Sequence, residues 1–237
     1  MHNDLIIMTS GAFTAAYLEL IPQLELLTKK ELITAATSIG TGENSIANRL
    51  RRGEPADVVI VADGVLIGFI EDGLIRAESY TPVARSAIGM AVRAGAPKPD
   101  LSSVEALTRT LLQANSIAYS ASVSGEYLTT ELYQRLGIAD QVMGKSRRIG
   151  GGERVGAVVA RGEAEIGFQQ LSELIPVPGI DHVTPLPPAA QKVSVFSAGV
   201  ATNTRDSDAA HALIRVLASP EAADAITHSG LEPIGNR

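Results

Sequence analysis

The alternation of strand-like and helix-like segments constrains the fold of this 237-residue chain more than any other sequence feature. Apolar, strand-like runs at residues 5–8, near 32–37 and at 57–61 are each followed by a turn and by apolar residues at helical spacing. Strands that alternate with helices form parallel sheets through right-handed crossovers. The sequence therefore predicts an α/β protein.

Two long extended segments, near residues 82–93 and 193–200, bracket a middle block that has its own strand–helix rhythm. This arrangement predicts two α/β lobes joined by two hinge strands. We expect residues 1–84 and 197–237 to form lobe 1, and residues 85–196 to form lobe 2. Open α/β sheets bind ligands outside the carboxyl ends of their strands, so we expect a ligand cleft where these ends face each other.

Two stretches of the middle block are predicted to lack regular structure. Residues 176–191 are rich in proline and are expected to form an irregular connection. The basic residues Arg147 and Arg148 are expected in a solvated loop just before Gly150–Gly152. That triple glycine is either an anion cradle or a flexible connector.

The composition excludes several classes of function. A hydrophobic content of 45% and a charged content of 19% indicate a folded chain, and a net charge of −6 argues against nucleic-acid binding. The chain has no cysteine, so disulfides and thiolate metal sites are excluded, and no apolar run is long enough to span a membrane. Residues 1–4 lead directly into the first strand, which indicates either a cytoplasmic protein or the mature form of an exported one.

Three strand-to-helix turns combine glycine with hydroxyl side chains: residues 9–11, 38–45 and 120–125. The first N–H groups of a helix have no partner inside that helix, and a glycine-rich turn lets them point at one spot. Such a turn can bind an anion. The alternative is an ordinary turn in which a hydroxyl caps the helix.

The order of five motifs resembles that of the molybdate-type periplasmic solute-binding proteins. The motifs are Thr9-Ser10-Gly11, Gly40-Thr41-Gly42, Gly53-Glu54-Pro55-Ala56-Asp57-Val58, Ser120–Gly125 and Arg161-Gly162-Glu163-Ala164-Glu165-Ile166-Gly167. The resemblance covers essentially the whole chain. It implies the type II periplasmic-binding-protein fold and an exported protein whose signal peptide has been removed.

The chain departs from the molybdate pattern where the ligand is expected. Molybdate receptors of this family carry a tyrosine before the next serine, whereas Gly167 here is followed by Phe168-Gln169-Gln170-Leu171-Ser172-Glu173. A combination of three motifs resembles a branch of the family that handles small organic carboxylates, of the aconitate isomerase type: Ala84-Arg85-Ser86, Gln169-Gln170-Leu171-Ser172-Glu173-Leu174 and Phe196-Ser197-Ala198-Gly199. The resemblance therefore favours a tricarboxylate ligand over molybdate.

Arg85 is the sharpest single candidate for contact with a ligand. It lies inside an otherwise apolar extended segment, and a buried charge without a partner is costly. A ligand carboxylate would match its planar fork of donors. A salt bridge to Asp57 or Asp63 would satisfy it equally well.

The remaining candidates follow from the turns and from the resemblance. Glu173 and Glu153 are candidate acid/base residues if the site desolvates them and raises their pKa; on an exposed helix face they would have no such role. The candidate ligand-binding residues are Thr9, Ser10, Gly11, Gly40, Thr41, Gly42, Asn44, Arg85, Ser122, Ser124, Gln169 and Gln170.

Two classes of function stay open at this point. The first is a cofactor-free isomerase that moves an allylic proton in an unsaturated tricarboxylate. The second is a non-catalytic receptor that delivers molybdate, another oxyanion or a carboxylate to an ABC permease. In both cases we expect a periplasmic monomer with no metal and no cofactor. The lack of a DNA-binding helix-turn-helix region argues against the effector domain of a regulator.

Overall fold

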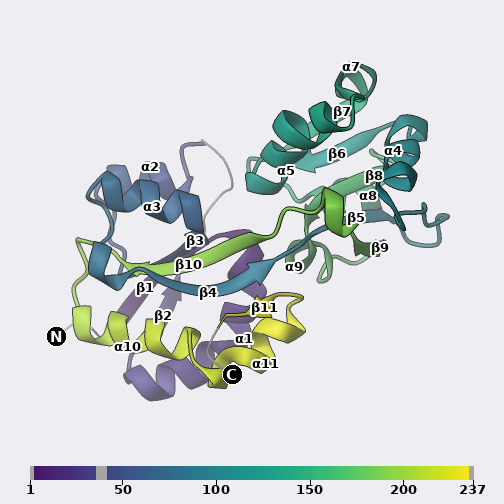
Figure 1. Ribbon diagram of the computed structural model, residues 1–237. Coiled ribbons are helices and arrows are strands. Elements are labelled where there is room, and N and C mark those ends of the chain that lie inside the picture. Colours follow the sequence, from purple (N-terminus) through teal and green to yellow (C-terminus); the bar gives the residue numbers. More distant parts are fainter. Residues whose placement is uncertain (1–2, 36–41, 235–237) are drawn as a thin grey trace. The chain divides into compact units, whose positions relative to one another are not determined.

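The computed structural model describes residues 3–35 and 42–234, with the backbone alone for residues 182–184 (Figure 1). It divides into two compact units, each built on its own sheet. Unit 1 comprises residues 1–86 and 194–237, and unit 2 comprises residues 87–193. Both units are α/β structures, as the alternation of strands and helices predicts.

Unit 1, in its described part, contains a six-stranded mixed sheet with the strand order β11-β4-β10-β3-β1-β2. Strands β1, β2 and β3 are parallel, and β10 runs antiparallel to β3 and β4. The strands are β1 (Asp4–Thr9), β2 (Glu31–Thr34), β3 (Val58–Ala62), β4 (Thr81–Ser86), β10 (Ser194–Val200) and β11 (Glu232–Pro233). Every residue of β3 is buried, which is why this strand is a continuous apolar run in the sequence.

Helices cover both faces of the unit 1 sheet (Figure 1). One group packs together on one face, and α3 contacts β3 and β10 on the other. The first group is α1 (Gly11–Thr28), α10 (Ser207–Leu217) and α11 (Ala223–His228), and the second is α2 (Ile46–Arg51) and α3 (Asp63–Glu71). Two short 3₁₀ segments are η1 (Ala77–Ser79) and η5 (Pro220–Ala222).

Asp57 is a buried carboxylate just before β3, and its oxygens accept hydrogen bonds from distant parts of unit 1. The donors are the Ile6 backbone at 2.8 Å, the Thr204 hydroxyl at 2.7 Å and the Arg205 backbone at 3.0 Å. These bonds tie β1 and β3 to the segment that leads into α10. Asp57 of the Gly-Glu-Pro-Ala-Asp-Val motif therefore has a structural role.

Unit 2 contains, within its described residues, a five-stranded sheet in the order β7-β6-β8-β5-β9. Strands β7, β6 and β8 are parallel, while β5 is antiparallel to both β8 and β9. The strands are β5 (Ile88–Arg93), β6 (Ile117–Ser120), β7 (Ser146–Ile149), β8 (Ile166–Gln170) and β9 (Ile180–Pro185). The helical segments are α4 (Val104–Gln113), α5 (Val123–Tyr127), the π-helical η2 (Leu128–Leu132), α6 (Tyr133–Arg135), α7 (Ala139–Val142), η3 (Met143–Lys145), α8 (Val155–Ala160), α9 (Leu171–Leu174) and η4 (Pro188–Ala190).

Two predictions of irregular structure in unit 2 are wrong. The proline-rich stretch contains strand β9, and the basic stretch around Arg147 and Arg148 forms strand β7. Both strands lie at edges of the sheet. An edge strand tolerates a proline and exposed charged side chains, because one side of it makes no ladder hydrogen bonds.

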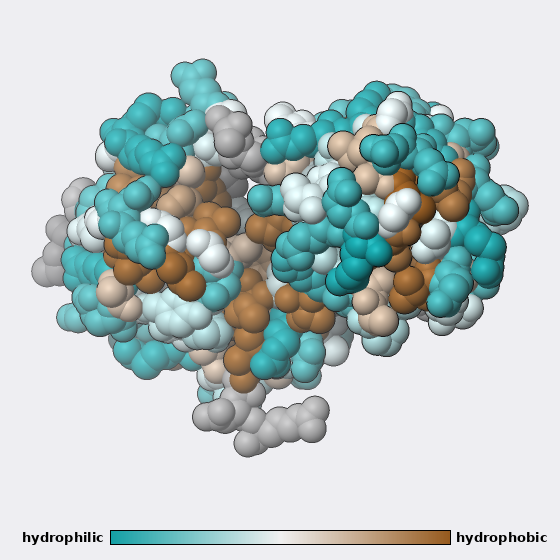
Figure 2. Space-filling view, turned by 45° about the horizontal axis from the view of Figure 1, so that its top comes forward, coloured by the Kyte–Doolittle hydropathy of each residue, from teal (hydrophilic) through white to brown (hydrophobic). Residues whose placement is uncertain are grey.

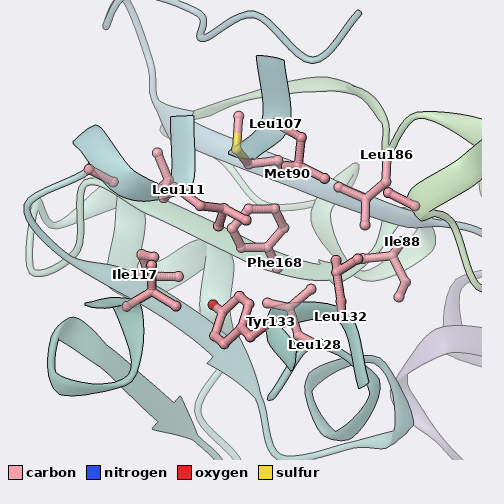
Figure 3. Packing of buried hydrophobic residues seen from close by; sticks show 14 of the residues in the cluster. Ile88, Met90, Leu107, Leu111, Ile117, Leu128, Leu132, Tyr133, Phe168 and Leu186 are labelled. Atoms are coloured by element: carbon pink, nitrogen blue, oxygen red, sulfur yellow. The ribbon is translucent and has the colours of Figure 1, made fainter. Parts of the chain in front are cut away.

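A core of aliphatic and aromatic side chains fills unit 2 around Phe168 of β8. Figure 3 shows the Phe168 ring among side chains from several elements, including Met90, Leu111, Leu132 and Tyr133. Burial raises the pKa of the Tyr133 phenol to about 12.

Hydrophilic residues cover much of the surface visible in Figure 2. Among the described residues, no helix is both long enough and apolar enough to cross a membrane.

Glycines allow two close approaches between helices and strands in unit 2. A Cβ atom at Gly125 would lie 1.8 Å from the Ser120 carbonyl oxygen, so α5 packs directly against the end of β6. A Cβ atom at Gly167 would lie 2.6 Å from the side chains of Val155 and Val159, so α8 packs closely over β8. The glycine that ends the Arg161–Gly167 motif is therefore required by packing.

We predict that Gly125→Ala destabilises the protein by about 2–3 kcal/mol, because the new methyl group meets a backbone oxygen that no rotamer change can move. The measurement is the free energy of unfolding in urea. Gly68→Ala is the matched control: Gly68 lies inside α3 and has open space around it, so this variant gains about 0.5–1 kcal/mol from helix propensity. Equal stability of the Gly125→Ala variant and the wild type would contradict the packing argument.

Candidate functional site

Polar side chains gather in unit 2 where the three parallel strands end. Strand β6 ends at Ser120, β7 at Ile149 and β8 at Gln170, and these carboxyl ends lie at one edge of the sheet. We call this the polar edge and define it as residues 120–124, 150–154 and 169–173. Open α/β sheets bind ligands at such an edge.

Three serine hydroxyls follow β6 and form a chain. The Oγ atoms of Ser120 and Ser122 lie 2.8 Å apart, and those of Ser122 and Ser124 lie 3.3 Å apart. Ser120 and Ser124 are buried. Each hydroxyl can donate one hydrogen bond and accept others, so the chain can turn its donors toward an anionic oxygen. The structure thus brings the predicted residues Ser122 and Ser124 together, and it adds Ser120.

Gln169, at the end of β8, is buried and is held from two sides. Its Oε1 accepts a hydrogen bond from the Val155 backbone at 3.2 Å, and its side chain also hydrogen-bonds to Glu173. The neighbouring Gln170 is buried as well, and in the ladder it pairs with Ile88 of β5. Gln169 therefore positions Glu173.

Glu173 lies on α9 and is only 6% exposed. Burial raises the pKa of its carboxyl to about 7, although the hydrogen bond from Gln169 and the positive charge of Arg154 oppose this rise. A carboxyl group with such a pKa is present in both its protonated and its ionised form near neutral pH. It can therefore both accept and donate a proton.

Glu153, the other candidate acid/base residue, is in a different environment. It is exposed, and one of its carboxylate oxygens lies 2.5 Å from the Arg161 guanidinium. Glu153 is therefore not desolvated, as a candidate acid/base residue was expected to be. Glu173, in contrast, does not lie on an exposed helix face, because α9 packs against β5 and β8.

Three buried serine hydroxyls have no hydrogen-bond partner among the described residues: Ser10, Ser86 and Ser172. Native proteins satisfy most of their buried polar atoms, so such hydroxyls are candidates for contact with a ligand or with water. Ser172 adjoins Glu173 on the polar edge, and Ser10 is a residue that the sequence predicts as a ligand contact. Ser86 and Ser172 are not among the ligand-binding residues that the sequence predicts.

Polar residues also follow the parallel strands of unit 1. Thr9 and Ser10 stand at the end of β1, where the Ser10 backbone donates to Ile60 of β3 at 2.8 Å. The Ser10 side chain makes no capping bond to α1, which begins at Gly11. Asp63 follows β3 and accepts hydrogen bonds from Tyr80 at 2.6 Å and Ser197 at 2.7 Å. The bond from Tyr80 to the Asp63 carboxylate raises the pKa of the phenol.

The turn at residues 38–45 is described only in part. Gly40 and Thr41 lie outside the described residues, so their predicted contacts stay predictions. Gly42 and Asn44 are exposed, and the Gly42 carbonyl accepts hydrogen bonds from Ser45 at 2.9 Å and Asn48 at 3.1 Å. The Ser45 hydroxyl caps α2, as expected for an ordinary strand-to-helix turn.

Arg85 is not the buried cation that its apolar neighbours suggest. Its side chain is 45% exposed, whereas the preceding residues Val83 and Ala84 are fully buried. Its guanidinium lies 3.7 Å from the carboxylate of Glu232 on β11, so neither Asp57 nor Asp63 is its partner. Contact between Arg85 and a ligand stays a prediction.

Comparison with known proteins shows the family to which the chain belongs. The sequence profile of the bacterial extracellular solute-binding proteins matches residues 5–232, and the chain belongs to that family. Aconitate isomerase from Pseudomonas sp. is 45% identical over 233 residues, which are 98% of this chain and 88% of that protein. These findings confirm the resemblance found in the sequence.

Solved structures confirm the type II periplasmic-binding-protein fold. The Azotobacter vinelandii periplasmic molybdate-binding protein matches with a TM-score of 0.75 and 21% identity, over 96% of this chain and 98% of its own. The sulfate-binding protein of Mycobacterium tuberculosis matches with a TM-score of 0.75 and 16% identity, over 98% of this chain and 88% of its own. At these identities the likeness concerns the fold alone.

The described part of the chain contains no group of three or more His, Asp or Glu side chains arranged to hold a metal ion. The side chains of the polar edge carry hydroxyl, amide, carboxyl and guanidinium groups.

We predict a pH-dependent stabilisation by Glu173→Gln. The Glu173 carboxyl titrates near 4.5 in the unfolded chain and at about 7 in the folded protein. Between these values the folded state binds more protons, so the free energy of unfolding of the wild type falls as the pH rises. The variant removes this loss, and its stability relative to the wild type increases by up to about 3 kcal/mol between about pH 5 and pH 8.

Urea unfolding at the two pH values measures this difference. Glu126→Gln serves as the matched control, because Glu126 is an exposed glutamate in the same unit and its replacement should leave the pH dependence unchanged. A Glu173→Gln variant that follows the wild type at both pH values would show that Glu173 is not desolvated.

Proposed function

We propose that this chain binds a small organic tricarboxylate and interconverts cis- and trans-aconitate without a cofactor. The observation that supports the proposal is a buried carboxyl group, Glu173, at the polar edge of a chain that is 45% identical to aconitate isomerase. A buried carboxylate repels an anionic ligand, so a plain anion receptor gains nothing from it. An isomerase needs a proton acceptor and donor in this place.

The proposed reaction is an allylic proton shift. The Glu173 carboxylate accepts a proton from the methylene carbon of aconitate, and the electrons of that C–H bond move into the allylic system. The protonated Glu173 then donates the proton to the carbon at the other end of the former double bond. Substrate and product have the same atoms, and no oxidant or reductant is consumed.

The polar edge has groups for the charge that develops during this reaction. Removal of the methylene proton places negative charge on the adjacent carboxylate of the substrate. The hydroxyls of Ser122 and Ser124 can donate hydrogen bonds to that charge, and Ser172 is a further donor beside Glu173. Donors that are already in place stabilise a transition state more than they stabilise the ground state.

The alternative function is a non-catalytic receptor for molybdate, another oxyanion or a carboxylate that works with an ABC permease. Membership of a family of solute-binding proteins favours this alternative. For both functions we propose a periplasmic monomer. The unit 1 residues Thr9, Ser10, Gly11, Gly42, Asn44 and Arg85 stay proposed ligand contacts.

Activity is the direct test. We expect the purified protein to convert trans-aconitate into cis-aconitate without added metal or cofactor, as followed by NMR in D₂O. Glu173→Gln should lower kcat by about 10²- to 10⁴-fold, because it removes the group that moves the proton. Its affinity for trans-aconitate, measured by calorimetry, should stay within a few-fold of the wild type.

Glu71→Gln is the matched control, because Glu71 is an exposed glutamate at the end of α3 in unit 1. Its kcat should equal that of the wild type. Binding of aconitate without conversion would favour the receptor over the enzyme. Stabilisation against heat by molybdate or tungstate, with none by cis-aconitate, trans-aconitate or citrate, would exclude the carboxylate ligand.

A further inference from the structure

Arg154 is a charged residue of the polar edge that the sequence-based choice of site residues missed. It follows the glycines at the end of β7 and occupies the N-cap position of α8. Its side chain is exposed, and no ion pair or hydrogen bond to its guanidinium is found among the described residues. Its positive charge acts on the carboxyl of Glu173.

Other arginines of unit 2 are engaged within the protein. Arg147 pairs with Glu163 at 3.1 Å, and Arg161 pairs with Glu153 and Glu163. Arg148 donates to the Ala121 carbonyl at 3.3 Å. Arg154 differs from them because its five N–H donors point to no acceptor in the described part of the chain.

The backbone around Arg154 is fixed, although its side chain is not. The next residue, Val155, donates its N–H to Gln169, which also holds Glu173. Val155 and Gly156 are buried, and Gly156 fits against Val177 and Ile180. One hydrogen-bonded connection therefore joins the backbone next to Arg154 to Gln169 and, through it, to Glu173, the candidate proton-transfer residue.

We propose that Arg154 binds a carboxylate group of the substrate and thereby places the reacting carbon beside Glu173. This inference rests on the proposed function. A planar guanidinium donates two parallel hydrogen bonds to a carboxylate, which fixes the orientation of the ligand as well as its position. The serine hydroxyls at residues 120–124 are then left for another carboxylate of the same substrate.

The effect of the Arg154 charge on Glu173 can be measured as a change in the pKa of Glu173, which a purely structural role of Arg154 would not produce. The positive charge of Arg154 lowers the pKa of Glu173 against the effect of burial. No other charged residue in the described part of the chain is found to act on Glu173, and Gln169, its hydrogen-bond partner, is neutral. Removal of the Arg154 charge should therefore raise the pKa of Glu173 further.

The experiment compares Arg154→Ala and Arg154→Lys with the wild type in the isomerisation of trans-aconitate. Arg154→Ala should raise KM about 10- to 100-fold, since it removes charged hydrogen bonds to the substrate. The ascending limb of the pH profile of kcat/KM should move to higher pH. Arg154→Lys should leave this limb unchanged, because the charge remains, while KM still rises because an ammonium group cannot form the fork.

Arg109→Ala is the matched control, because Arg109 is an exposed arginine of the same unit that lies on α4, 4.0 Å from Asp100. Its KM and pH profile should equal those of the wild type. An unchanged KM in Arg154→Ala, or an equal rise in Arg109→Ala, would overturn the proposal.

Calorimetry with trans-aconitate separates this inference from the proposed function. If the wild type binds trans-aconitate without converting it, the isomerase function fails, and a 10- to 100-fold higher Kd in Arg154→Ala still supports the role of Arg154. If the wild type converts aconitate and all variants have the same KM, the role of Arg154 fails alone. If the wild type binds no tricarboxylate, both fail.

Discussion

The hydrogen bond from the Val155 backbone to the Gln169 side chain organises the polar edge of unit 2. It joins the start of α8 to the end of β8 across fourteen residues of sequence. Because a buried amide must find partners, this bond fixes the side chain of Gln169 and directs its remaining polar group to Glu173. The backbone of Arg154, one residue before Val155, is held at the same place by the same connection.

Charge balance at this edge is what distinguishes an enzyme from a receptor. A buried Glu173 costs stability when it is ionised, and its negative charge opposes the binding of an anion. In a receptor, the buried carboxylate would only weaken stability and anion binding. In a proton-transfer reaction, the same carboxyl group accepts and donates the proton. The positive charge of Arg154 and the hydroxyls of the serine chain both compensate for negative charge.

The fold alone does not separate these functions. Molybdate- and sulfate-binding proteins have the same architecture at 21% and 16% identity, so the two-unit scaffold accommodates different ligands. Open α/β sheets bind ligands at the carboxyl ends of their strands, so we expect the difference in function to lie in the side chains there. In this chain those side chains include the Glu173 carboxyl and the Gln169 amide, which share a hydrogen bond, and the Arg154 guanidinium, whose positive charge acts on Glu173.

The sequence by itself determined the α/β class, the family and the polar residues that end β6 and β8, because strand–helix periodicity and short motifs are local features. Only the tertiary structure decided the environment of those residues. Glu173 is buried because α9 packs against β5, where a Cβ at Gly89 would lie 2.2 Å from Leu171. Arg85 is exposed beside Glu232, which lies far along the chain. Burial and ion pairing depend on such distant neighbours, and a local pattern does not contain them.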